Sequence, residues 1–194
     1  DPNIVHVDGN VNPVRDKEII DTELQIKDLD TVENRISKVQ KQAQTGGDKN
    51  AKRLLDILLK YKEALIQGKS ARTVEIDNAE DKKLAKDLFL LTDKPVLYVC
   101  NVDENSAKNG NQYVEQVKEA IKDENAQLLI VAAKIESEIA ELENFEEREM
   151  FLSEIGLVES GVSRVIKAAY ALLNLETYFT AGVQEVRAWT YPKG

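Results

Sequence analysis

The chain has 194 residues, of which 26 are Lys or Arg and 35 are Asp or Glu, so its formal net charge is −9. Hydrophobic residues make up 42%, enough to form a buried core, whereas 9 Gly and 4 Pro are too few for a turn-rich β-sandwich. A single cysteine and a single histidine exclude a disulfide scaffold, a Cys-rich zinc site and a His-pair metal site.

The first elements predicted along the chain are a short strand and a helical region. Residues 4–7 form a β-branched apolar run that the polar residues 8–10 stop, which predicts a strand entering a turn. Residues from about 16 onward have a helical pattern. Asp30 with Glu33 three residues later is typical of a capping box, so we expect a new helix to begin there.

Two consecutive segments then share an apolar spacing of alternately three and four residues, which indicates one buried face on each of two helices. The first segment breaks at the turn 45–48 and the second ends at Gly68. The short connection predicts an antiparallel coiled-coil hairpin over residues 29–70. The apolar positions are Val32, Ile36, Val39 and Ala43 in the first helix and Leu54, Leu58, Tyr61 and Leu65 in the second.

The predicted hairpin is basic although the protein is acidic. Residues 34–69 carry nine Lys or Arg against three Asp or Glu, a net charge of +6, which leaves −15 for the rest of the chain. This asymmetry favours contact with a polyanion such as RNA. The alternative is that these residues are only solvated helix formers. Under the first interpretation the candidate contacts are Lys38, Lys41, Lys49, Lys52 and Arg53.

Strands and helices alternate in the second half of the chain, an order typical of a doubly wound α/β fold. After a linker at about 69–78 we expect, in turn, helix 79–91, strand 96–100, helix 112–122, strand 127–131, and helices that begin near 135 and after 161. The stretch 178–190 predicts a β-hairpin that opens a further β unit.

Polar residues follow the first of these strands, at the strand end where ligands bind in open α/β sheets. The run Asn101-Val102-Asp103-Glu104 partly matches the Asn-Lys-x-Asp motif with which GTP-binding proteins recognise guanine. The longer side chain of Glu104 would occupy the space of the guanine exocyclic amine, which favours adenine. Residues 131–134 (Val-Ala-Ala-Lys) follow the next strand, where the same proteins carry Ser-Ala-Lys. The alternative is a pair of polar loops without a ligand.

Several short stretches, taken together, are distinctive. They are residues 4–13, Asp21 to Leu24, Asp28 to Thr31, Asn101 to Glu104, Ala133 to Glu136, Tyr178 to Val183 and Glu185 to Thr190. In these stretches the sequence resembles the Obg-like ATPase family, the YchF type of P-loop NTPase, and the resemblance runs along the whole chain.

This resemblance implies a fold and an activity. The fold would be α/β: a Ras-like P-loop NTPase domain formed by residues 1–28 and 71–174, interrupted by the helical hairpin, with the start of a TGS (β-grasp) domain at 175–194. The activity would be that of a ribosome-associated enzyme that hydrolyses ATP in preference to GTP, with ATP and Mg²⁺ as cofactors. The basic hairpin would dock on the large ribosomal subunit or on RNA.

The resemblance also implies roles for five residues of the two strand-end loops. Asn101 would bond the adenine, and Val102 would contact it through its backbone and side chain. Glu104 would hold the loop and exclude guanine. Ala132 and Ala133 would close the other side of the base.

The family's phosphate-binding loop, magnesium ligands and switch segments have no counterpart in this sequence. No G-x-x-x-x-G-K-[ST] motif follows a strand, and Gly68-Lys69-Ser70 imitates only its last residues. We therefore expect a truncated segment that has no catalytic residue, whose Mg²⁺ ligands lie upstream of residue 1, and that does not hydrolyse ATP alone. Two alternatives stay open: a docking module for RNA, the ribosome or a protein, without enzymatic activity, and a GTP-binding protein.

The remaining features favour structural roles. Carboxylates in the Glu-rich stretch 136–149 lie opposite an apolar face, which favours a solvated helix over a metal site. His6 and Cys100 are expected to pack within strands, and Trp189 to support the TGS-like strand. No apolar stretch approaches the roughly 20 residues of a membrane span, so we expect a cytoplasmic protein without membrane contact.

Overall fold

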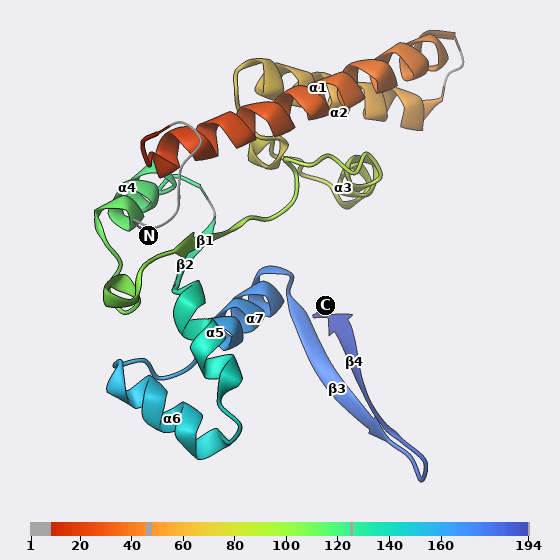
Figure 1. The fold of residues 1–194 in the computed structure, drawn as a ribbon. Helices are drawn as coiled ribbons and strands as arrows, with labels where there is room; N and C mark the ends of the chain where they lie inside the picture. Colours follow the sequence, from red (N-terminus) through yellow and green to blue (C-terminus); the bar gives the residue numbers. More distant parts are fainter. Residues whose placement is uncertain (1–8, 46–47, 125, 194) are drawn as a thin grey trace. The chain divides into compact units, whose positions relative to one another are not determined.

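The computed structural model describes residues 9–45, 48–124 and 126–193, which form a mixed α/β structure (Figure 1). The chain divides into two compact units, one formed by Arg15–Pro95 and the other by Asp1–Val14 with Val96–Gly194. The predicted strand at 4–7, with His6, lies outside the described residues.

Two helices dominate the unit Arg15–Pro95. Helix α1 (Pro13–Thr45) is continuous, and α2 (Lys49–Ile66) follows after a short connection. The expected helix start at Asp30 is wrong: α1 begins at Pro13, a favoured first helical residue, and no Gly or Pro interrupts it before residue 46. Asp48 does begin a helix, because its side chain accepts hydrogen bonds from two backbone N–H groups at the start of α2.

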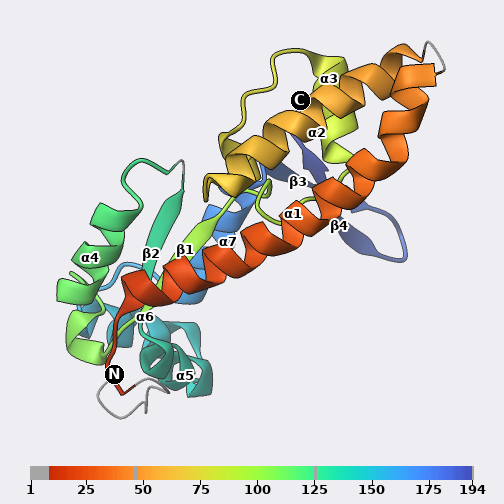
Figure 2. The same ribbon diagram turned by 90° about the horizontal axis from the view of Figure 1, so that it is seen from above.

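The helices α1 and α2 lie side by side and share one core (Figures 1 and 2). The predicted apolar positions meet there, and Val32, Leu58 and Tyr61 are almost completely buried. Burial and the nearby charge of Asp93 raise the pKa of Tyr61 to about 12. The apolar spacing thus identified the packing faces correctly, while the supercoiled geometry of a coiled coil stays a prediction.

A buried carboxylate holds the end of this unit. Asp28 of α1 is only 2% exposed and accepts hydrogen bonds from the N–H of Leu91 (2.8 Å) and from the N–H and hydroxyl of Thr92 (2.7 Å each). The Thr92 hydroxyl in turn accepts from the N–H of Ala71 at 2.9 Å. This clamp ties three segments together that are distant in the sequence.

The clamp also explains why the helix in the structure is shorter than the predicted helix 79–91. Helix α3 spans Ala79–Lys86. After the helix ends at Lys86, the chain turns at Phe89, whose φ of 51° lies in the left-handed region, and presents the N–H groups of Leu91 and Thr92 to Asp28. A three-residue 3-10 turn, η1 (Ala71–Thr73), precedes α3.

The other unit contains a two-stranded parallel sheet. Strand β1 (Leu97–Asn101) and strand β2 (Gln127–Val131) are connected through η2 (Glu104–Ser106) and helix α4 (Gln112–Ala120). These elements agree with the predicted ones to within one or two residues. Figure 2 shows the two strands next to each other.

Three helices and a hairpin complete this unit. Helices α5 (Ala133–Glu141) and α6 (Phe145–Glu154) replace the single acidic helix expected near residue 135, and α7 (Gly161–Leu172) follows. The predicted C-terminal hairpin is confirmed as β3 (Leu175–Ala181) and β4 (Val186–Pro192), paired antiparallel. The indole N–H of Trp189 donates to the hydroxyl of Thr180 at 2.9 Å, a structural role.

We expect Asp28→Asn to lower the free energy of unfolding by about 2–3 kcal/mol, because an amide cannot accept all three hydrogen bonds and leaves a buried donor unsatisfied. Urea denaturation measures this loss. Asp30→Asn is the matched control, since Asp30 lies on the same helix but is exposed, and its effect should stay within about 0.5 kcal/mol. Equal effects of the two substitutions would contradict the clamp.

Candidate functional site

The two predicted strand-end loops lie next to each other. Strands β1 and β2 are parallel and in a register that places Asn101 opposite Val131, so both strands end at the same edge. The N–H of Val102 donates to the carbonyl of Val131 at 2.9 Å and extends the pairing one residue past β1. The loops that follow the strands therefore start side by side, as a nucleotide-base site requires.

Asn101 connects the two loops directly. Its side-chain oxygen accepts a hydrogen bond from the N–H of Ala133, the first residue of α5, at 3.0 Å. The side chain is exposed, and its amide nitrogen donates to no group among the described residues. Asn101 thus braces the second loop and keeps two N–H donors available to a ligand.

Val102 and Ala132 have buried side chains. They are 7% and 4% exposed and belong to one hydrophobic cluster with Ala107, Val114 and Ile135. Both side chains thus anchor the two loops in this hydrophobic cluster. The side chain of Val102 therefore has little exposed surface with which to make the contact that the resemblance assigns to it.

Glu104 lies at the rim of the same edge. It is the first residue of η2, its side chain is 51% exposed, and its carboxylate is 3.6 Å from the ammonium of Lys134 at the start of α5. The neighbouring Asp103 caps η2, and hydrogen bonds from the hydroxyl and N–H of Ser106 hold its pKa below the ordinary value. The acid predicted to select the base therefore faces the second loop.

A second acid has a structural task that the sequence did not indicate. The carboxylate of Glu136 accepts hydrogen bonds from the N–H groups of Gly161 (2.6 Å) and Val162 (3.1 Å), the first residues of α7. A negative charge at a helix N-terminus is favourable because the backbone N–H groups there are unpaired. The expectation that carboxylates of this stretch are only solvated is wrong for Glu136.

Helix α7 is also bonded to the sheet. The guanidinium of Arg164 donates to the carbonyl of Ile130 in β2 at 2.8 Å. Gly161 permits the close approach, because a Cβ there would lie 2.8 Å from an oxygen of Glu136 and 2.9 Å from a methyl of Val131. The contacts of Glu136, Gly161 and Arg164 thus support the second loop. The only sequence signal for this role was that Glu136 ends one of the stretches that carry the family resemblance.

The predicted basic contacts fall into two groups. Lys38, Lys41, Lys49 and Lys52 are exposed on α1 and α2. Arg53 has a structural role within the unit, because it pairs with Glu80 and with Asp81 (2.8 Å) and donates to Asn78 at 3.0 Å. These contacts raise the pKa of its guanidinium and use its charge to hold α3 against α2.

Three other features of the described part of the chain bear on its function. No group of three or more His, Cys, Asp or Glu residues there could hold a metal ion. Cys100 is half-buried in β1, and burial raises the pKa of its thiol. None of the helices described is both long and apolar enough to span a bilayer.

Comparison with known proteins finds homologues along the whole chain. The chain is 53% identical over 196 residues to the ribosome-binding ATPase YchF of Bacillus subtilis and 49% identical over 192 residues to the protein of that name in Escherichia coli O157:H7. It is 38% identical over 198 residues to Obg-like ATPase 1 of Rattus norvegicus. These alignments cover 99–100% of the chain. The chain is homologous to the YchF and Obg-like ATPases over its full length.

A solved structure of a YchF protein has a similar fold over the length of this chain. The YchF GTPase of Schizosaccharomyces pombe superposes with a TM-score of 0.86 at 30% identity, covering 100% of this chain and 53% of that one. The chain spans about half the length of the YchF and Obg-like relatives it matches. No protein-family model matches it. The relatives' names differ in the nucleotide, since the bacterial proteins are called ATPases and the yeast protein a GTPase.

We expect Gly161→Ala to destabilise the protein by about 1–3 kcal/mol, because the added methyl overlaps the Glu136 carboxylate and the Val131 side chain. Thermal unfolding followed by circular dichroism measures the change. Gly182→Ala is the control, because a Cβ there meets only the carbonyl of Glu185 at an ordinary 3.7 Å. A Gly161→Ala protein as stable as this control would show that α7 does not need the close approach.

Proposed function

We propose that this chain is the base-recognition part of a ribosome-associated Obg-like ATPase that binds and hydrolyses ATP in preference to GTP. The hydrogen bond from Ala133 to Asn101 carries this proposal, because it joins the two loops between which the base would lie. The relatives named ribosome-binding ATPases support the same assignment. Such a protein would work in the cytoplasm.

In this proposal the two loops hold and select the purine. The free amide N–H groups of Asn101 donate to an acceptor nitrogen of the base, while Ala133 presents backbone and a small side chain to its face. Glu104 is held toward the loop by Lys134 and places a carboxylate where guanine would bring its exocyclic amine. The backbone of Val102 and Ala132 lines the site, and their side chains anchor it in the core.

The phosphates of ATP need other residues. A Gly-x-x-x-x-Gly-Lys-Ser/Thr loop, which binds phosphates through backbone N–H groups, does not occur in the 194 residues. Mg²⁺ bound to a nucleotide neutralises charge on the β- and γ-phosphates, and the described residues provide no cluster of carboxylates for it. We therefore propose that this chain alone binds ATP weakly and does not hydrolyse it.

Base preference can be tested at Glu104. In a form of the protein that also carries a phosphate-binding loop, we expect Glu104→Asp to lower the preference for ATP over GTP by about tenfold, because the shorter acid leaves room for guanine to donate to it. Competition titrations with both nucleotides measure the ratio. Asp103→Glu in the same loop is the control and should leave the ratio unchanged. An unmodified protein that prefers GTP would instead support the GTP-binding alternative.

A second function, docking on the ribosome, is supported by the exposed lysines of α1 and α2. We propose that the basic hairpin at 29–70 contacts RNA of the large subunit, and that the β3–β4 hairpin begins a TGS domain. Arg53 is left out of this contact, because its charge is paired within the unit. A docking module without enzymatic activity would use the same surface.

Docking predicts a charge-dependent loss of binding. We expect the triple variant Lys41→Gln, Lys49→Gln and Lys52→Gln to cosediment with ribosomes at least about tenfold more weakly than the unmodified chain, because each phosphate contact releases counterions. The matched control replaces three exposed lysines of the other unit, Lys118, Lys122 and Lys167, whose surface ion pairs are worth little. Equal losses in both triple variants would show that only net charge matters.

A further inference from the structure

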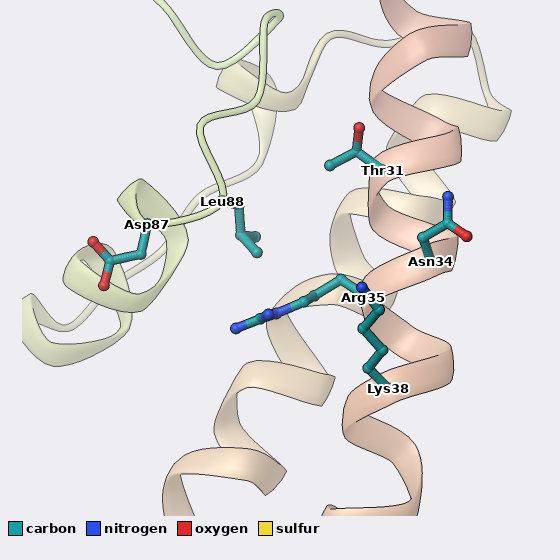
Figure 3. Close-up of a pocket in the computed structure, with 6 residues that line it drawn as sticks. All are labelled: Thr31, Asn34, Arg35, Lys38, Asp87 and Leu88. Carbon is teal, nitrogen blue, oxygen red and sulfur yellow. The ribbon is translucent and has the colours of Figure 1, made fainter.

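The unit Arg15–Pro95 contains a cleft, and of its lining residues only Lys38 is among the lysines considered above for docking. It has a volume of about 360 Å³ and lies between one face of α1 and the turn that follows α3 (Figure 3). Its lining residues are Thr31, Asn34, Arg35, Lys38, Asp87 and Leu88. Four of these occupy successive positions on one face of α1, because residues three and four apart lie next to each other on a helix.

Two cations face this cleft without an acidic partner. Neither Arg35 nor Lys38 makes an ion pair with any described residue, and the positions three and four residues away on α1 carry no acid for either. Figure 3 shows the Arg35 guanidinium reaching into the gap and the Lys38 side chain extending along α1 toward Arg35. The carboxylate of Asp87 is turned away from Arg35. Two like charges so placed favour a bound anion between them.

Two other basic side chains of the unit have structural roles. Lys62 of α2 is paired with Glu33 at 2.7 Å, and Arg53 is paired with Glu80 and Asp81. Those pairs hold elements of the unit together. Arg35 and Lys38 form no such ion pair with a described residue, although α1, on which both lie, also contributes residues to the core.

The walls of the cleft are fixed by the surrounding structure. Asp28 anchors the chain after α3 at Leu91 and Thr92, and Arg53 anchors the beginning of α3. Leu88 packs against the core shared by α1 and α2. An anion would thus enter a preformed site, which reduces the entropic cost of binding.

We propose that this cleft binds a backbone phosphate of single-stranded RNA, with Arg35 and Lys38 as the charged ligands and Asn34 as an additional donor. A guanidinium fits two phosphate oxygens at once, and the amide of Asn34 can donate to another oxygen. The choice of RNA over an acidic peptide rests on the proposed ribosome docking. A volume of about 360 Å³ also exceeds a single phosphate and leaves room for the attached sugar.

The test measures binding of a labelled, single-stranded oligouridylate to the full chain by fluorescence anisotropy over a series of KCl concentrations. We expect Arg35→Gln and Lys38→Gln each to weaken binding by about tenfold. Each substitution should also lower the magnitude of the slope of log K against log [KCl] by about 0.7. Arg35→Lys keeps the charge but loses the planar fork, and its affinity should be intermediate.

The matched control is Lys60→Gln, which removes one exposed charge from α2 of the same unit and should change the affinity by no more than about twofold. Because Arg35 and Lys38 make no hydrogen bond or ion pair with a described residue, all variants should keep the thermal stability of the unmodified chain. An equal loss in Lys60→Gln, no loss in Arg35→Gln, or no RNA binding at all would overturn the proposal. Equal competition by oligoglutamate would assign the cleft to an acidic peptide instead.

Ribosome cosedimentation of the same variants separates this proposal from the docking proposal. If ribosome binding depends on Lys41, Lys49 and Lys52 but not on Arg35 or Lys38, the docking proposal is supported and the cleft is not the site that binds ribosomal RNA. If the oligouridylate binds in an Arg35-dependent manner while the chain does not sediment with ribosomes, the proposed RNA site in the cleft is supported and the docking proposal is contradicted.

Discussion

The parallel register of β1 and β2 is the constraint on which the candidate base site depends. It places Asn101 opposite Val131, so the two polar loops begin at one edge and the Asn101 side chain can accept the N–H of Ala133. A shift of one residue would turn every side chain of one strand to the other face. The residue that follows the shifted strand, Val102 or Ala132, would then leave the core, and the loops would lose one anchor and their connection.

Two acids, Asp28 and Glu136, have a similar organising role elsewhere in the protein. Asp28 accepts three hydrogen bonds and fixes the turn after α3, while Glu136 accepts two and fixes the start of α7. In both cases a carboxylate satisfies backbone N–H groups that have no helical or strand partner. Burial and the charge of Asp28 raise the pKa of Asp93, so this clamp also affects its neighbour.

Much of the fold was predictable because it depends on local patterns. Apolar spacing located the packed faces of α1 and α2, and two short apolar runs located β1 and β2. The failure at Asp30 has a physical cause. A capping box stabilises a helix end, but the same residues are acceptable inside a helix when no Gly or Pro precedes them, so the signal could not exclude the continuous α1.

The sequence by itself determined the element order, the positions of the two loops and the family resemblance, because these depend on residue type, spacing and short motifs. Only the tertiary structure decided which charges are available. It paired Arg53 with α3, gave Glu136 to the N-terminus of α7, buried the Val102 side chain, and left Arg35 and Lys38 facing a cleft. Each of these outcomes depends on a partner far away in the chain or on the shape of a packed core. Composition and local spacing contain no information about such long-range contacts.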